Sequence, residues 1–127
     1  LFNAGAGNCH NGGHPIELYE TFASQLSKLA DNTKIYPGHD YITNNLEFTL
    51  AREADNARAK TLLADIKDQD PAAALVSTIG LEREINTFFR LQNPTVIATL
   101  KAEFPDMPDD PDPQIVFLKL RELRNTW

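Results

Sequence analysis

The first third of the chain changes from strand-like to helical spacing and back again. Large apolar residues recur there at intervals of three and four, as on one face of a helix, at Tyr19, Phe22, Leu26 and Leu29. Pro15 suits the first turn of this helix. The apolar run 33–36 predicts a short strand, which Pro37 ends. With Leu1-Phe2 as a strand remnant, the order strand, loop, helix, strand predicts part of an α/β layer.

The remaining two thirds of the chain show helical spacing almost throughout. An apolar stripe starts at Ile42, and either Asp55 or Asn56 can cap the helix that follows it. A third helix is expected over 81–85, where Glu82 would act as an acid in the first turn. Two more helices are expected, at 95–104 and 115–123.

Two further features complete this pattern. Phe88-Phe89 is expected to fill part of a core, and the acidic, proline-rich stretch 107–113 is expected to be a solvated linker. The prediction is therefore a short α/β piece, residues 1–43, joined to an all-α piece, residues 44–127. We expect the helical piece to hold most of the independent stability.

Composition excludes several classes of protein. The chain has 127 residues, enough for one domain with a core, and its formal net charge is -6 with a pI near 4.9. This acidity argues against a general binder of nucleic acid or of anionic membranes. A single cysteine excludes an internal disulfide framework, and no apolar stretch approaches the ~20 residues that span a bilayer. The chain starts on Leu1 as if inside a strand, so we expect it to be a piece of a longer protein.

One histidine has the setting of a metal ligand. His39 follows the predicted strand 33–36 and the tight turn at Pro37-Gly38, and rigid elements of this kind fix the direction of an imidazole. A lone histidine is more often structural, so the neighbouring motifs decide between the two readings. Cys9, His10 and His14 match no common zinc module, and the aspartates of 106–112 lack the glycine and glutamate of a calcium loop.

Ordered segments along nearly the whole chain share motifs with one enzyme family. They lie at 1–7, 36–48, 53–56, 77–79, 86–90 and 116–125. The run Tyr36-Pro37-Gly38-His39-Asp40-Tyr41 resembles the last metal-ligand motif of the glyoxalase II family, the hydroxyacylglutathione hydrolases of the metallo-β-lactamase superfamily. That motif is close to Tyr-x-Gly-His-Glu-Tyr-x-x-Asn-Asn. The opening Leu-Phe-Asn-Ala-Gly-Ala-Gly is similar to the family's Leu-Phe-x-Ala-Gly-Cys-Gly loop.

The resemblance implies a fold and a chemistry. Residues 1–43 would be the end of the catalytic αββα sandwich, and residues 44–127 the helical substrate-binding domain. Two metal ions, zinc with iron or manganese as alternatives, would generate a hydroxide that attacks the thioester of S-lactoylglutathione, giving lactate and glutathione. Only His39 maps onto a metal ligand. The other ligands would lie upstream, so we expect this piece alone to bind no metal stably and to be inactive.

The same resemblance implies residues that bind the substrate. Arg121 and Arg124 lie at i and i+3 on one helical face and match family cations that contact the glycine carboxylate of glutathione. Tyr41 matches a tyrosine that contacts its peptide part. Asn8, Cys9 and His10 lie in the first loop, where the family carries a cation at the position of Asn8 and an aromatic at that of His10. Glutathione affinity could fall here, or another thiol could be preferred.

Alternatives remain open at this point. The two arginines could simply solvate a terminal helix, and Tyr41 could be a packing residue. The chain could belong to a related enzyme that acts on another glutathione derivative, such as a persulfide dioxygenase with one iron, or it could be a non-catalytic helical interaction module. The expected partners are the glutathione thioester and the missing N-terminal half, with self-association of the piece as an option. A cytoplasmic location is the family-based expectation.

Overall fold

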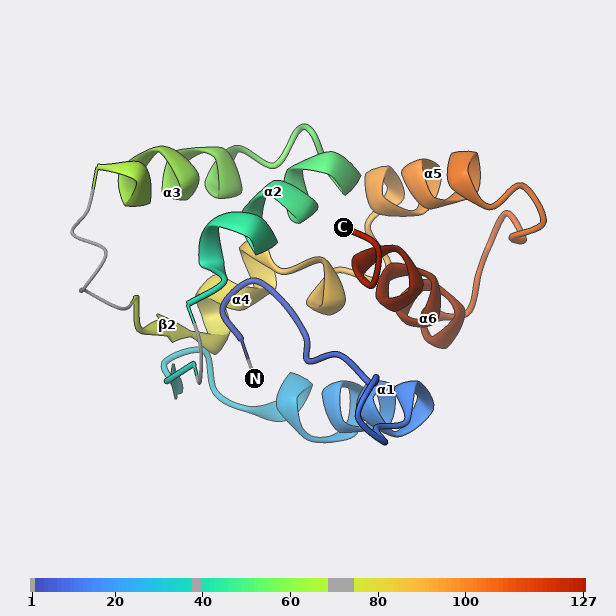
Figure 1. The fold of residues 1–127 in the computed structure, drawn as a ribbon, viewed down its shortest axis with the longest axis horizontal. Helices are drawn as coiled ribbons and strands as arrows, with labels where there is room; N and C mark the ends of the chain where they lie inside the picture. The colour runs from blue at the N-terminus through green and yellow to red at the C-terminus, as the bar shows by residue number, and fades with distance from the viewer. Residues whose placement is uncertain (1, 38–39, 69–74) are drawn as a thin grey trace.

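Helices dominate the fold, and a small two-stranded sheet links the first third of the chain to its middle (Figure 1). The structure is a computed structural model that describes residues 2–37, 40–68 and 75–127. Its helices are α1 (Pro15–Ser24), η1 (Leu26–Lys28), α2 (Ile42–Arg52), α3 (Ala57–Lys67), α4 (Ile79–Ile85), η2 (Thr87–Phe89), α5 (Pro94–Glu103) and α6 (Pro113–Arg124). Its strands are β1 (Lys34–Ile35) and β2 (Ser77–Thr78).

The sheet pairs β1 with a strand from the helical half of the chain. The two strands are antiparallel, with Lys34 opposite Thr78 and Ile35 opposite Ser77. The strand predicted over 33–36 is therefore confirmed in a shorter form, and β2 covers one of its edges. Of the predicted strand remnant Leu1-Phe2, the structure describes Phe2, which forms an isolated antiparallel bridge with Gly5. The described residues form a helical domain with this small sheet, and they do not display an αββα sandwich.

Side-chain caps fix the starts of several helices. The Asn56 side chain accepts from the Ala59 N–H at 3.0 Å and starts α3, as one of the two predicted caps. Thr78, Asn93 and Asp112 cap α4, α5 and α6 in the same way. Each cap satisfies a backbone donor that the helix itself leaves unpaired, which explains why these boundaries follow the sequence closely.

Among the described residues, two buried clusters form the core. The larger one is rich in aromatic residues and includes Phe22, Phe48, Phe88 and Phe117. Phe22 and Phe117 lie 5.3 Å apart between ring centroids, and Phe88 and Phe117 lie 5.1 Å apart. The smaller cluster joins α2, α3 and α4 through Ile42, Leu46, Ala59, Leu62 and Ile85. The predicted core role of Phe88 is confirmed, since only 1% of its surface is exposed.

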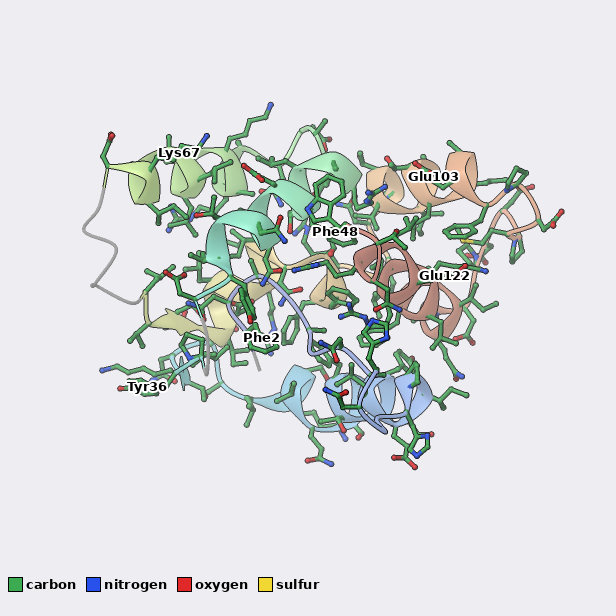
Figure 2. All side chains as sticks on the ribbon, in the orientation of Figure 1. Phe2, Tyr36, Phe48, Lys67, Glu103 and Glu122 are labelled. Carbon is green, nitrogen blue, oxygen red and sulfur yellow. The ribbon has the colours of Figure 1, made fainter. Side chains whose placement is uncertain are left out.

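The N-terminal segment, residues 2–7, connects these two clusters. Ala4 belongs to the smaller cluster and Ala6 to the larger one. Figure 1 shows the segment crossing the middle of the molecule, beside α2 and α4, and Figure 2 places Phe2 there too. Tyr36, at the end of β1, instead points outward and is 72% exposed. Residues of the predicted α/β piece therefore differ sharply in burial.

Hydrogen bonds hold the N-terminal segment on both sides. The carboxylate of Glu82 accepts the Ala4 N–H at 2.9 Å, and the Asn86 amide donates to the Gly5 carbonyl at 3.1 Å. The Asn45 amide donates to the Asn3 carbonyl at 3.0 Å. A segment without regular structure can be buried only when its backbone groups find such partners.

Two expectations need correction. Leu29 does not continue the buried face of α1, because the α-helix ends at Ser24 and the following 3-10 turn changes the angle between successive residues, leaving Leu29 40% exposed. The stretch 107–113 is not wholly solvated, since Met107 joins the larger cluster and is 5% exposed. The prediction that Glu82 lies in the first turn of its helix is confirmed, and the structure adds that Glu82 is fully buried.

Candidate functional site

A cavity of about 340 Å³ gathers most of the predicted substrate-binding residues. We call it the cationic pocket. It is lined by Asn8, His10, Tyr41, Asn45, Arg121 and Arg124, together with Phe2, Ala6 and Asn125. The N-terminal segment, the first turn of α2 and the last turn of α6 therefore meet here, although they are far apart in the sequence.

Arg121 is the buried cation of this pocket, with 4% of its surface exposed. Its Nη1 donates to the carbonyls of Ala6 at 2.8 Å and Gly7 at 2.9 Å. Its Nε and Nη2 both donate to the Oδ1 of Asn125, at 3.3 and 3.1 Å. The two hydrogen bonds from Nη1 therefore hold the end of the N-terminal segment against α6, so the Arg121 side chain has a structural role.

Arg124 is only half-buried and has a different partner. Its Nε and Nη2 donate to the Oδ1 of Asn45, at 3.2 and 3.0 Å. Within the described ranges, its Nη1 makes no hydrogen bond. Both arginines line the pocket, but they differ in burial: Arg121 is buried against residues 6–7, and Arg124 is half-buried against Asn45.

The electrostatics of the pocket favour an anion. Burial lowers the pKa of Arg121, and the neighbouring charge of Arg124 lowers it further, while Cys9 acts in the opposite direction. Burial also lowers the pKa of Arg124. Both side chains stay cationic, because a guanidinium keeps its proton in proteins. Neither arginine forms an ion pair with a carboxylate of the described residues, so a bound anion would relieve the repulsion between them.

The other predicted residues lie at the rim of the pocket or near it. Tyr41 precedes α2, is 47% exposed, and its ring centroid lies 5.3 Å from that of Phe2. Asn8 and His10 are exposed, and the Asn8 side chain accepts from the His10 N–H at 3.3 Å. Cys9 is half-buried and does not line the cavity.

The predicted metal ligand cannot be placed. His39 lies outside the described residues. Across residues 2–37, 40–68 and 75–127, no three side chains of histidine, cysteine, aspartate or glutamate gather to form a metal site. Since a zinc site needs three or four protein ligands, the described residues do not fit a metal centre by themselves.

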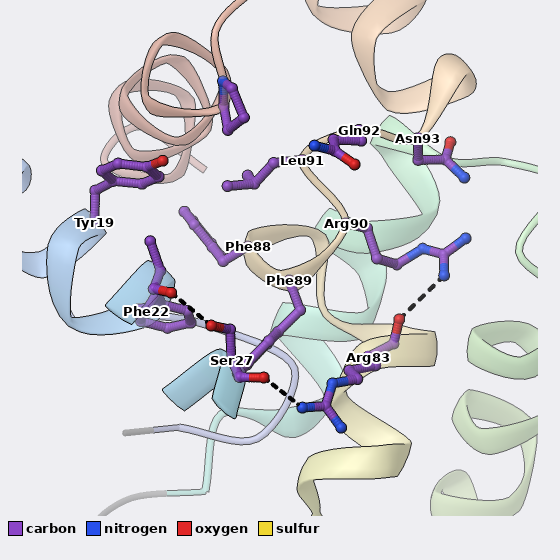
Figure 3. A pocket seen from close by; sticks show the side chains of 12 residues that line it. Tyr19, Phe22, Ser27, Arg83, Phe88, Phe89, Arg90, Leu91, Gln92 and Asn93 are labelled. Carbon is purple, nitrogen blue, oxygen red and sulfur yellow. Dashed lines mark hydrogen bonds between the residues drawn. The ribbon is translucent and has the colours of Figure 1, made fainter. Parts of the chain in front are cut away.

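A second cavity, of about 410 Å³, also contains arginines, but these are paired with carboxylates. Figure 3 shows the rings of Phe22, Phe88 and Phe89 on one of its sides and two arginines on another. Arg90 is paired with the buried Glu53, and its Nε donates to that carboxylate at 2.8 Å. Arg83 is paired with Asp31 and donates to the Ser27 carbonyl. The cations of this aromatic cavity are therefore already neutralised, unlike Arg121 and Arg124.

Sequence reasoning missed two residues of the cationic pocket. Asn45 and Asn125 orient the two arginines, and neither was singled out for a function. Asn45 lies one helical turn after Tyr41, beside the apolar stripe of α2 that starts at Ile42. A poor helix former on the inward face of a helix is the signal that could have revealed it.

Comparison with known proteins agrees with this geometry. Residues 40–127 match the family described as "Hydroxyacylglutathione hydrolase C-terminus". The chain belongs to this family. The match begins at Asp40, directly before Tyr41, and includes Asn45, Arg121 and Arg124.

Several relatives carry the name hydroxyacylglutathione hydrolase. The protein of Nitrosococcus oceani is 67% identical over 127 residues, which is 100% of this chain and 48% of that protein. The protein of Polaromonas sp. is 63% identical, with 100% and 48% covered, and that of Anaeromyxobacter dehalogenans is 39% identical, with 98% and 49% covered. The chain thus spans about half the length of the curated relatives it matches, and these names do not favour the dioxygenase or the interaction module. None of the helices that the structure describes has the length and apolarity of a membrane span.

Proposed function

We propose that this chain is the C-terminal, glutathione-binding part of a hydroxyacylglutathione hydrolase, an enzyme that hydrolyses the thioester of S-lactoylglutathione. The observation that carries this proposal is the cationic pocket, where Arg121 and Arg124 lie together without a carboxylate partner among the described residues. The family match and the names of the relatives support it. The missing half of the protein would be the main partner of the chain, and a cytoplasmic location belongs to the same proposal.

The contacts of the two arginines indicate different roles in the pocket. Arg124 would bind a carboxylate of glutathione, because its Nη1 is not used in hydrogen bonds to the described residues. Arg121 would contribute its charge and hold the N-terminal segment in place, since its donors already contact Ala6 and Gly7. Tyr41 would contact the peptide part of the substrate from the rim.

The first loop would bind glutathione without the usual family side chains. Asn8 and His10 line the pocket where the family carries a cation and an aromatic residue. We expect Asn8→Lys to raise the affinity for glutathione, because it adds a third cation to the pocket. If the affinity and the efficiency on the thioester stay unchanged, this position does not contact the thiol carrier.

The hydrolytic chemistry belongs to residues outside the described part of this chain. We propose that His39 is one ligand of a centre of two metal ions, zinc with iron or manganese as alternatives, and that the other ligands come from the missing half. Such ions supply a hydroxide near neutral pH.

Two measurements on the full-length protein test the proposed function. The first is turnover of S-lactoylglutathione together with metal content, where activity and two bound metal ions are expected. The second is calorimetric titration with glutathione, compared with a glutathione derivative whose carboxylates are both amidated. Tighter binding of the unmodified peptide is expected. A metal-loaded protein that neither hydrolyses the thioester nor binds glutathione would reject the proposal.

A further inference from the structure

Asn45 occupies the junction between the N-terminal segment and the cationic pocket. Its side chain is almost completely buried, with 4% of the residue exposed. The amide nitrogen donates to the Asn3 carbonyl at 3.0 Å, and the amide oxygen accepts from both Nε and Nη2 of Arg124. Its own backbone N–H donates to the Tyr41 carbonyl, which places the two residues one turn apart on α2.

The orientation of this amide is fixed from both ends. A carbonyl oxygen accepts only from the nitrogen side of an amide, and a guanidinium donates only to the oxygen side. A flipped amide would therefore lose its bonds to both Asn3 and Arg124. Gly5 closes the remaining space, since a Cβ at this position would lie 2.6 Å from the amide nitrogen of Asn45.

The side-chain partner of Arg124 carries no charge, and the same holds for Asn125, the side-chain partner of Arg121. Elsewhere in the molecule, Arg90 is held by the carboxylate of Glu53, and that carboxylate raises the pKa of Arg90. A carboxylate holds a guanidinium firmly but also cancels its charge. A neutral amide oxygen provides similar geometry and leaves the charge of the guanidinium available.

We propose that Asn45 is a positioning residue of the substrate site. It holds Arg124 in one orientation through a neutral oxygen, so that the full positive charge remains for a carboxylate of the ligand. It also ties this arginine to the N-terminal segment through Asn3, so that the order of the segment and the direction of the guanidinium depend on one side chain. This inference rests on the proposed function, with glutathione as the source of the carboxylate.

Asn45→Asp keeps an acceptor for Arg124 and adds a negative charge, and it also removes the amide donor to the Asn3 carbonyl. The new carboxylate neutralises the arginine, so we expect the affinity of the full-length protein for glutathione to fall about tenfold. Asn45→Ala removes the acceptor and should lower the affinity by a similar factor through loss of orientation. Asn44→Asp is the matched control, because it adds the same charge to the exposed neighbouring position of α2 and should change the affinity less than about twofold.

Hydrogen exchange of the Arg124 Nε–H, followed by NMR, reports positioning without any ligand. It should be slow in the wild type and in Asn45→Asp, and fast in Asn45→Ala. Unchanged glutathione affinity in Asn45→Asp, or equally fast exchange in the wild type and Asn45→Ala, would overturn the inference. If Asn45→Asp does not fold, the exchange in wild type and Asn45→Ala decides. Absence of glutathione binding by the wild type would reject the proposed function, while the exchange would still show whether Asn45 holds Arg124.

Discussion

The two sides of the N-terminal segment contain opposite charges that do not meet. On one side, the buried carboxylate of Glu82 is held by neutral donors, namely the Ala4 N–H, the Ser77 hydroxyl at 2.7 Å and the Asn86 amide at 2.8 Å. On the other side, Arg121 and Arg124 are held by neutral acceptors. Neither side pairs with the other in the hydrogen bonds and ion pairs of the described residues.

The Glu82 side and the arginine side of the segment differ in their access to a ligand. The Glu82 side is closed and 0% exposed, so its unpaired charge serves the fold by accepting donors from separate elements. The arginine side lines a cavity, so its unpaired charge can receive an anion. The backbone of residues 2–7 forms hydrogen bonds with both groups, because the Ala4 N–H donates to Glu82 and the Ala6 and Gly7 carbonyls accept from Arg121.

The largest effect is expected from removing the carboxylate. Glu82→Ala leaves the Ala4 N–H without an acceptor and opens a void, and we expect the free energy of unfolding to fall by about 3 kcal/mol. Glu84→Ala, on the exposed side of α4, should change it by less than about 0.5 kcal/mol. Urea titrations of both variants measure this. If both variants lose the same free energy of unfolding, the hydrogen bonds of Glu82 do not contribute more than those of an exposed glutamate.

The next effect connects the two sides. Gly5→Ala places a methyl group against the Asn45 side chain, and we expect a loss of about 2 kcal/mol in the free energy of unfolding from the overpacking. Glutathione affinity should fall too, because Asn45 also holds Arg124. Gly7→Ala is the control, since the nearest atom to a Cβ there is a ring carbon of Phe2 at 3.9 Å. If both variants keep wild-type stability, the close approach at Gly5 is unimportant.

A smaller effect, confined to binding, is expected at Arg124. Arg124→Gln should weaken glutathione binding about tenfold, equivalent to about 1.4 kcal/mol, with a loss of unfolding free energy near 0.5 kcal/mol. Arg58→Gln removes the same charge from an exposed position on α3 and should leave the affinity unchanged. Calorimetric titration of both variants measures the contrast. If Arg124→Gln lowers the free energy of unfolding strongly but leaves the glutathione affinity unchanged, Arg124 has a structural role and does not bind the ligand.

The smallest effect is expected from pH. Burial raises the pKa of Glu82, although hydrogen bonds from Ser77, Asn86 and Ala4 act in the opposite direction. The native state therefore binds this proton more tightly than the unfolded chain, so the contribution is full below the ordinary value of 4.5 and is lost as pH rises through the raised native pKa.

Glu82→Gln isolates that contribution, because the substituted side chain does not titrate. The unfolding free energy of the wild type minus that of Glu82→Gln should decrease as pH rises from below 4.5 and then level off. Urea titrations between acid and neutral pH measure the difference. A difference that rises with pH would mean that the hydrogen bonds outweigh the burial of the carboxylate.

Local signals in the sequence predicted the helices well. Asn56 caps α3, and the spacing after Ile42 gives α2 its buried face, because caps and periodicity act within a few residues of one another. The aromatic pair Phe88-Phe89 was correctly expected in the core. Family motifs added Tyr41, Arg121 and Arg124, which the structure gathers at one cavity.

Contacts over long sequence distances were not predicted. Nothing local shows that Glu82 accepts from Ala4, that Arg121 donates to Ala6, or that Arg124 donates to Asn45. Arg121 and Arg124 look alike in the sequence, and only the packing of α6 against the N-terminal segment separates a structural cation from one available to a ligand. The β1–β2 pairing likewise joins segments that no short-range pattern connects.

The sequence by itself therefore determined the helices, their caps and the kinds of side chain available for binding an anionic substrate. These depend on interactions within one or two helical turns and on residue chemistry. The tertiary structure alone decided which charges remain unpaired, because that depends on which backbone groups residues 2–7 bring to Glu82, Asn45 and Arg121. Through this packing, the glycine-rich opening segment contacts both the buried carboxylate of Glu82 and the residues of the cationic pocket.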